Sequence, residues 1–304
     1  MHSASSTPCQ IATKHAYLIM AHKGPEQLKL LISLLDDPRN DIFVHCDKKS
    51  DPSILEAFKA ISPKESSYAV FSENAISWGS YALIDTELKL LKKATKNNVY
   101  GYYHLLSGTC LPLKSQDVIH QFFDQSQKEF VGFCNKDEWP GATWRAEYPH
   151  IPSLRKSPLG WRLDNILGKI RKLGSPKKTP ITYGYGSQWF SITHSLACDL
   201  LAHEDWIREH FCHSFAGDEL FLQSFIMTFG YEDRLPGKMG DTHHAITNMR
   251  LIDWARGDGN HQYTWHKEDF DTIMQSEMLF GRKFSLAEDD EVIYKLIDSI
   301  AASA

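Results

Sequence analysis

Long apolar runs, paired cysteines and an excess of positive charge are all missing from this chain of 304 residues. No stretch approaches the roughly 18 apolar residues of a membrane-spanning helix, and the serine-rich segment 1–13 lacks the apolar centre of a signal peptide. We therefore expect a disordered leader over 1–13 and a single domain over 14–300. The net charge of -5 argues against bulk nucleic-acid binding, which requires a basic surface.

Six cysteines are scattered along the sequence without a C-x-x-C pair, and no N-x-S/T glycosylation sequon is present. A chain of this length can bury a core without disulfides, and scattered thiols are typical of a reducing compartment. These absences predict reduced cysteines and a cytoplasmic protein, with at most a peripheral place at the inner membrane face.

Apolar runs alternate with helical patterns through the first half of the chain. Buried strands are predicted at 17–20, 41–45, 68–71 and 102–106, and helices at 28–35, 54–61 and 82–94. This alternation favours an α/β fold with a mostly parallel central sheet flanked by helices on both faces.

Small or polar residues follow the predicted strands, at the edge where parallel sheets bind ligands. The candidate contacts there are Ala21, His22, Asp47, Trp78, Gly79, Ser107 and Gly108. A nucleotide could approach such a backbone closely, and Asp47 could bind a donor group of a ribose or a uracil. Each segment alone is most simply an ordinary turn, but four in series favour a binding site.

Two carboxylates, Asp218 and Glu219, precede apolar residues at helical spacing. They are predicted near a helix start, where the helix dipole stabilises negative charge. One could cap the helix while the other faces a cavity, although charges at helix starts are common and the pair alone favours a structural role. Upstream, 186–192 reads as a loop that runs into a strand and carries Ser187 and Trp189.

Two cations in the last quarter, Arg250 and Lys283, could hold a diphosphate that gains charge as it leaves. Taken alone, each is more simply a surface charge.

A basic segment at 155–178 carries an apolar stripe of Ile166, Leu167, Ile170 and Leu173. It predicts a basic amphipathic helix that could lie on an anionic membrane surface or a partner. The alternative, which the pattern favours, is a surface helix whose stripe is buried in the core.

A carboxylate pair for a divalent metal is missing after the strand at 102–106, so we expect no metal cofactor. One Asp-x-Asp does occur, at Asp269 and Asp271, but it starts a helix and is better explained by capping. His210, Cys212 and His213 have no standard zinc spacing.

Together, these segments resemble the core-2/I-branching β-1,6-N-acetylglucosaminyltransferase family, which includes the peptide xylosyltransferases. The matching segments, in order, are YLIMAHKGP (17–25), FVHCDKKS (43–50), SWGSYALIDTELKLL (77–91), YHLLSGTCLPL (103–113), GSQWFSIT (186–193) and GDELF (217–221). Segments around Arg250 and Lys283 match the closing basic motifs. Each motif is weak alone, but their order across residues 15–285 is specific.

The resemblance implies a glycosyltransferase-A-type fold and metal-independent transfer with inversion at the anomeric carbon. It assigns the catalytic base to Glu219, and the side chains that replace a metal at the diphosphate to Arg250 and Lys283. The implied donor contacts are Ala21, His22, Asp47, Trp78, Gly79, Ser107, Gly108, Ser187, Trp189 and Asp218. The halves 14–135 and 136–300 would bind the nucleotide and carry the acceptor and catalytic groups.

The resemblance also implies UDP-N-acetylglucosamine as donor, with UDP-xylose as the alternative. The family's acceptor-side tryptophan and tyrosine segment has no counterpart in 235–248, and the cysteines and membrane anchor of the animal enzymes are missing. These departures favour a bacterial-type enzyme that acts on a surface polysaccharide or lipid-linked glycan. Arg145 and Glu147 lie near the family's acceptor loop. The alternatives from other classes are an inactive carbohydrate-binding protein and a metal-dependent phosphodiesterase using Asp269 and Asp271.

Overall fold

The computed structural model describes residues 14–173, 179–237, 247–258 and 261–302. The leader predicted over 1–13 and the end of the basic segment, 174–178, lie outside these residues.

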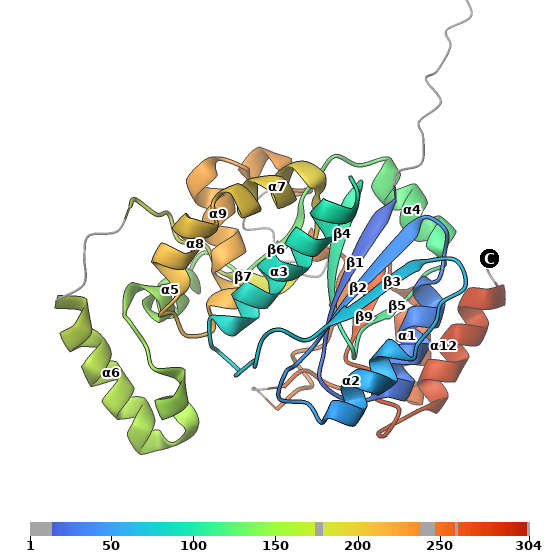
Figure 1. Ribbon diagram of the computed structural model, residues 1–304, viewed down its shortest axis with the longest axis horizontal. Helices are drawn as coiled ribbons and strands as arrows, with labels where there is room; N and C mark the ends of the chain where they lie inside the picture. The colour runs from blue at the N-terminus through green and yellow to red at the C-terminus, as the bar shows by residue number, and fades with distance from the viewer. Residues whose placement is uncertain (1–13, 174–178, 238–246, 259–260, 303–304) are drawn as a thin grey trace, which may run out of the picture.

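A six-stranded sheet forms the centre of the molecule, with the strand order β3-β2-β1-β4-β7-β6 (Figure 1). The strands are β1 (His15–Ala21), β2 (Asn40–Cys46), β3 (Ser67–Phe71), β4 (Tyr102–Ser107), β6 (Phe130–Phe133) and β7 (Gly186–Thr193). The first four are parallel, whereas β7 runs antiparallel to both β4 and β6. The predicted α/β class with a mostly parallel sheet is confirmed. The segment 186–192, predicted as a loop that runs into a strand, lies entirely within β7.

Helices cover both faces of this sheet. They are α1 (Pro25–Leu35), α2 (Pro52–Lys59), α3 (Ala82–Asn97), α4 (Gln116–Asp124), α5 (Trp139–Glu147), α6 (Pro158–Leu173), α7 (His194–Ala202), α8 (Glu204–Phe211), α9 (Phe221–Phe229), α11 (Phe270–Gln275) and α12 (Glu291–Ala302). The five cysteines among the described residues are free thiols.

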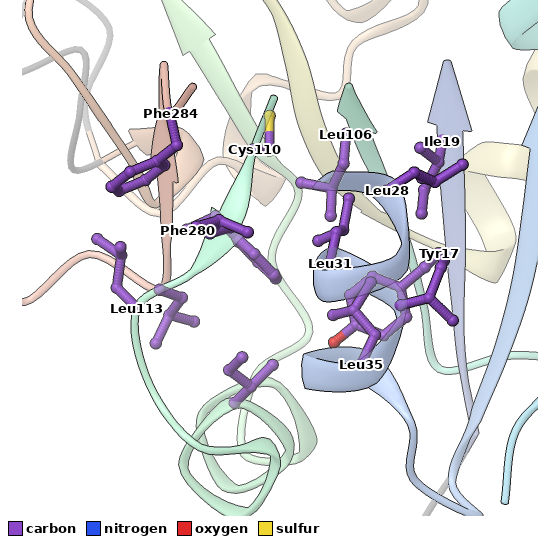
Figure 2. Close-up of a cluster of buried hydrophobic side chains, with 14 of the residues drawn as sticks. Tyr17, Ile19, Leu28, Leu31, Leu35, Leu106, Cys110, Leu113, Phe280 and Phe284 are labelled. Atoms are coloured by element: carbon purple, nitrogen blue, oxygen red, sulfur yellow. The ribbon is translucent and has the colours of Figure 1, made fainter. Parts of the chain in front are cut away.

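Side chains of β1 alternate between two hydrophobic cores, one on each face of the sheet. Tyr17 and Ile19 pack with α1 and the C-terminal segments, while Ala16 and Leu18 pack with α3 and α7 to α9. Figure 2 shows the first core, where Leu28, Leu31 and Leu35 of α1 lie near Tyr17 of β1, and Phe280 and Phe284 lie near Leu113. Because both faces are covered, the strands read as continuous apolar runs.

A second, three-stranded sheet of β5 (Leu111–Pro112), β9 (Phe280–Arg282) and β8 (Arg250–Ile252) lies beside the first. Its strands β8 and β9 are parallel. Phe284 donates its backbone N–H to Thr109 O at 3.0 Å. The second sheet therefore brings the chain after β9 to the turn that follows β4.

The helix α6 stands at the edge of the molecule, away from the central sheet (Figure 1). Its buried positions are Gly160, Asp164 and Gly168, one on each successive turn. A side chain at Gly160 would collide with Leu154 O at 1.9 Å, so the helix packs by its smallest residues. The apolar stripe consequently faces outward, with Ile170 59% exposed and Leu173 90% exposed.

The expectation that the α6 stripe is buried in the core is therefore wrong. Ile166 is also 57% exposed, and Leu167 37%. Among the described residues, no helix is both long and apolar enough to cross a membrane.

Candidate active site

The turns after β1, β2 and β4 lie side by side at one edge of the sheet. Asp47 donates its N–H to Ala21 O at 2.9 Å, and Gly108 donates to Met20 O at 3.0 Å. A Cβ at Gly108 would lie 3.1 Å from Ala21 Cβ, so a larger residue would push these turns apart. The predicted strand-end residues are thus gathered, as parallel strands require.

Asp47 organises this edge through its carboxylate. Its Oδ1 accepts backbone N–H groups from Lys49 at 2.9 Å and Ile76 at 3.1 Å. Ser50 donates its hydroxyl to His22 O at 2.8 Å. Partial desolvation by the surrounding protein lowers the pKa of the His22 imidazole. One Asp47 oxygen therefore orders the backbone of Lys49 and Ile76.

The Trp78–Gly79 turn joins this edge to the chain that carries the carboxylate pair. Trp78 is 77% exposed, and its ring packs edge-on against Phe215 with centroids 5.2 Å apart. Ala216 donates its N–H to Gly79 O at 2.9 Å. Gly79 has a φ of 73°, and a Cβ there would lie 2.6 Å from the Phe215 ring, so glycine is needed twice over.

Glu219 ends the short 3-10 helix η2 (Gly217–Glu219), directly before α9. Its Oε2 accepts a hydrogen bond from Arg145 Nη1 at 2.6 Å, and its side chain is 33% exposed. Arg145 also accepts the Phe215 N–H at its own carbonyl and stacks over Tyr185. The structure therefore brings together Glu219 and one of the two predicted acceptor-side residues.

The other acceptor-side candidate, Glu147, lies apart from Glu219. It accepts the Thr143 hydroxyl at 3.3 Å and lies 4.0 Å from Lys172 of α6. The structure thus separates two residues that the sequence had grouped.

Asp218 is 8% exposed, and its Oδ1 has no hydrogen-bond partner among the described residues. Burial, followed by the charge of Glu219, raises the pKa of Asp218 to about 7. A third carboxyl, Glu87 of α3, lies fully buried nearby and accepts Gln188 Nε2 at 2.8 Å. Burial and then Asp218 raise the pKa of Glu87 well above its usual value.

Sequence reasoning missed Glu87 because it lies within an ordinary amphipathic helix. The available signal was its place among the apolar positions Ile84, Leu88 and Leu91, which form the buried side of α3. A carboxylate on the buried side of a helix is costly unless it is hydrogen-bonded or paired.

Arg282 is a second residue that sequence reasoning passed over. Its guanidinium lies 4.6 Å from the centre of the Trp189 ring and donates to the hydroxyls of Ser107 and Thr109, the latter at 3.0 Å. Trp189 is 8% exposed, and Ser187 Oγ accepts its N–H at 3.2 Å. Arg282 therefore joins the turn after β4 to the start of β7. The sequence pattern assigns the contact with the leaving diphosphate to its neighbour Lys283.

The two predicted cations lie at different depths. Arg250 is 1% exposed and donates to Ser191 Oγ at 2.8 Å and to Phe190 O at 2.6 Å. Burial lowers its pKa to about 9. Lys283 is one-third exposed and lies 3.5 Å from Glu288. Arg250 is thus buried, whereas Arg282 reaches the turn after β4 and the Lys283 side chain lies near Glu288.

Asp269, the first residue of the Asp-x-Asp, caps the short 3-10 helix η4 (Lys267–Asp269) and makes no side-chain capping bond to α11. Asp269 Oδ2 accepts the His266 N–H at 3.1 Å, and Oδ1 accepts Arg256 Nη1 at 2.6 Å. The predicted capping role of Asp269 is confirmed.

Comparison with known families decides the identity of this arrangement. A model of the Core-2/I-Branching enzyme family matches residues 15–276. The chain belongs to this family. It is therefore a glycosyltransferase, and its sheet is consistent with a glycosyltransferase-A-like fold. The matched region includes Glu219 and Arg250 and ends before Arg282. No curated protein matches this transferase at a significant level.

Proposed function

We propose that this glycosyltransferase moves a sugar from a UDP-sugar to a hydroxyl of a glycan acceptor, with inversion and without a divalent metal. The observation that carries the proposal is the position of Glu219. Its carboxylate is partly exposed and held by Arg145, and the chain that carries it bonds through Ala216 to the Trp78–Gly79 turn.

Glu219 is the base in this mechanism. Arg145 occupies Oε2, and no hydrogen bond to Oε1 occurs among the described residues, so Oε1 is the oxygen that accepts the acceptor's proton. The hydroxyl oxygen attacks the anomeric carbon as the bond from that carbon to the diphosphate oxygen breaks. UDP leaves with the bonding electron pair, and an α-linked donor gives a β-linked product.

The leaving diphosphate gains negative charge, which cations stabilise most strongly in a dehydrated site. We assign this role to Arg282, which donates to Ser107 and Thr109 at the turn after β4, and to Lys283, whose chain neighbour Phe284 bonds to Thr109 O. Arg250, expected from the family pattern, is buried here and supports β4 and β7 from beneath through Leu105 O and Phe190 O. Its direct contact with the diphosphate remains a prediction.

UDP-N-acetylglucosamine is the proposed donor, and UDP-xylose is the alternative. All the donor contacts stay predictions: Ala21, His22, Asp47, Trp78, Gly79, Ser107, Gly108, Ser187, Trp189 and Asp218. The proposed acceptor is a bacterial surface polysaccharide or a lipid-linked glycan in the cytoplasm.

A screen of UDP-sugars for UDP release, run in parallel with and without EDTA, tests this proposal. We expect one donor to give clear release, which increases when glycan acceptors are added. Release from no donor would support an inactive carbohydrate-binding protein. Loss of release in EDTA with recovery in manganese would contradict metal independence.

The exposed face of α6 supports contact with an anionic membrane surface. Burying an exposed isoleucine or leucine is worth about 1.5–3 kcal/mol, and each nearby cation adds about 1 kcal/mol at an anionic leaflet. A hollow of about 550 Å³ lies at the start of α6. Of the two arginines in its lining, Arg155 has a buried side chain paired with Asp164 at 2.5 Å, whereas Arg162 is exposed. Arg162 therefore supplies the charge that complements a phosphate-bearing surface.

Vesicle co-sedimentation tests this contact. The double substitution Ile166→Ser with Ile170→Ser should abolish binding to anionic vesicles. Val118→Ser is the control, because Val118 is similarly exposed at 44% but lies on α4. Equal binding of the parent to neutral and anionic vesicles would contradict the role of charge.

A further inference from the structure

Two buried histidine nitrogens without hydrogen-bond partners lie near a carboxylate at the start of β1. His15 is the first residue of β1, and His120 and Asp124 lie one turn apart on α4. His15 Nε2 and His120 Nδ1 are inaccessible and have no partner among the described residues. His15 Nε2 lies 3.9 Å from Asp124 Oδ1, too far for a hydrogen bond. Potential ligand atoms of the three residues all lie within 4.8 Å of one another.

The neighbours of His120 determine which of its nitrogens carries the proton. Its Nε2 lies 2.9 Å from Asn40 Oδ1. Asn40 Nδ2 donates to Leu35 O at 2.9 Å, so Oδ1 is the amide oxygen and can only accept. His120 Nε2 is therefore the protonated nitrogen, and Nδ1 keeps its lone pair.

The other face of the cluster orients His15. Its Nδ1 lies 3.2 Å from His104 Nε2, and His104 Nδ1 lies 2.7 Å from Ser191 Oγ. When each ring donates from Nδ1 along this chain, His15 Nε2 is left with a lone pair. Metal-bound histidines are commonly held in this way, by donation from the second ring nitrogen.

We propose that His15, His120 and Asp124 bind one divalent transition-metal ion of the Zn²⁺ type, with water as the fourth ligand. Two imidazole nitrogens and one carboxylate are a ligand set that suits zinc. Asp124 also lines a surface hollow of about 880 Å³, which gives an ion and its water a path inward. The two rings stack at 4.0 Å with 21° between their planes, so binding requires them to splay.

This site lies far from the reacting groups. Its residues are at the start of β1, whereas the proposed donor site follows the end of the same strand, roughly 20 Å away at about 3.3 Å per residue. The ion would clamp the start of β1 to the end of α4. The proposal is thus independent of the proposed glycosyl transfer, and its test uses no activity measurement.

The test is zinc retention by the full chain. The protein is stripped with a chelator, incubated with Zn²⁺ and desalted, and its metal content is measured. We expect one zinc per chain in the parent and an absorption spectrum of tetrahedral cobalt when Co²⁺ is used instead. Asp124→Asn removes a ligand while keeping the shape of the side chain, and should weaken zinc binding at least about 10-fold.

Two controls separate this site from surface binding. Asp117→Asn removes a carboxylate from the same helix, where Asp117 is 73% exposed. His261→Gln removes a histidine that is 77% exposed and paired with Asp258. Both should bind zinc as the parent does, and zinc should raise the melting temperature of the parent but not of Asp124→Asn. The proposal is overturned if the parent keeps no zinc, if Asp124→Asn matches the parent, or if His261→Gln loses the ion.

Discussion

Arg145 Nη1 donates to Glu219 Oε2 at 2.6 Å, across 74 positions of sequence. The Arg145 side chain is 18% exposed and that of Glu219 33%, so the pair is shielded from water on most sides. Because Arg145 also accepts the Phe215 N–H, it fixes both the backbone and the carboxylate of the turn before α9. The contact leaves Glu219 one oxygen for chemistry.

The first prediction concerns this pair. Arg145→Met should lower kcat about 10–100-fold, because a charged hydrogen bond of this kind is worth about 1.5–3 kcal/mol. Combined with Glu219→Gln, it should cause little further loss, because Arg145 acts through Glu219. Steady-state kinetics of the two single variants and the double variant measure this coupling. Fully additive losses would show that Arg145 acts elsewhere.

The second prediction assigns Arg282 to the leaving group. Arg282→Gln should weaken inhibition by UDP about 10-fold or more, because it removes a cation next to the diphosphate. Lys295→Gln is the matched control, since Lys295 is 50% exposed on α12 and should not affect UDP. The measurement is the inhibition constant for UDP. Equal constants for the parent and Arg282→Gln would show that Arg282 does not contact the diphosphate.

The third prediction follows from the raised pKa of Asp218. The native carboxyl holds its proton up to about pH 7, whereas the unfolded one releases it near about pH 4. The native state therefore binds more protons in this window, and the parent loses stability as pH rises through it. The asparagine in Asp218→Asn cannot titrate, so the variant does not lose this stability. From pH 4 to pH 7, the free energy of unfolding of Asp218→Asn should therefore rise relative to that of the parent by about 1–4 kcal/mol.

Urea denaturation at several pH values measures this difference for Asp218→Asn. Asp271→Asn, at the start of α11, is the control and should follow the parent. A difference that is constant with pH would contradict the raised pKa of Asp218.

The fourth prediction concerns the turn that holds the carboxylate pair in place. Gly79→Ala should destabilise the fold by about 2–4 kcal/mol, since it combines a left-handed backbone with a collision against Phe215. Gly230 has a similar φ of 75° but open space around its Cα, so Gly230→Ala isolates the backbone effect at about 1–2 kcal/mol. Equal losses in thermal or urea unfolding would show that the Phe215 ring moves aside.

Local patterns in the sequence predicted much of this fold because they follow directly from burial. Apolar runs marked the four parallel strands, and turn residues marked their ends, so the grouping of Ala21, Asp47 and Gly108 followed from sheet topology. The reversal of β7 did not follow, because an antiparallel strand buried on both faces has the same apolar pattern as a parallel one.

Long-range packing decided what the sequence could not. Arg250 and Arg282 are equally basic in sequence, but only the pairing of β8 with β9 shows that one is buried and the other reaches Ser107. The stripe of α6 had the spacing of a core face. The structure turned it outward because Gly160 and Gly168 allow the opposite face to pack more closely.

The role of Glu219 as the base is tested by comparing the parent with Glu219→Gln in glycosyl transfer and in UDP binding. Glutamine has nearly the same shape and can still accept from Arg145, but it cannot take the acceptor's proton. We expect kcat to fall about 10²–10⁴-fold, with the dissociation constant for UDP unchanged within about twofold by calorimetry. A kcat within tenfold of the parent's would contradict the assignment of Glu219 as the catalytic base.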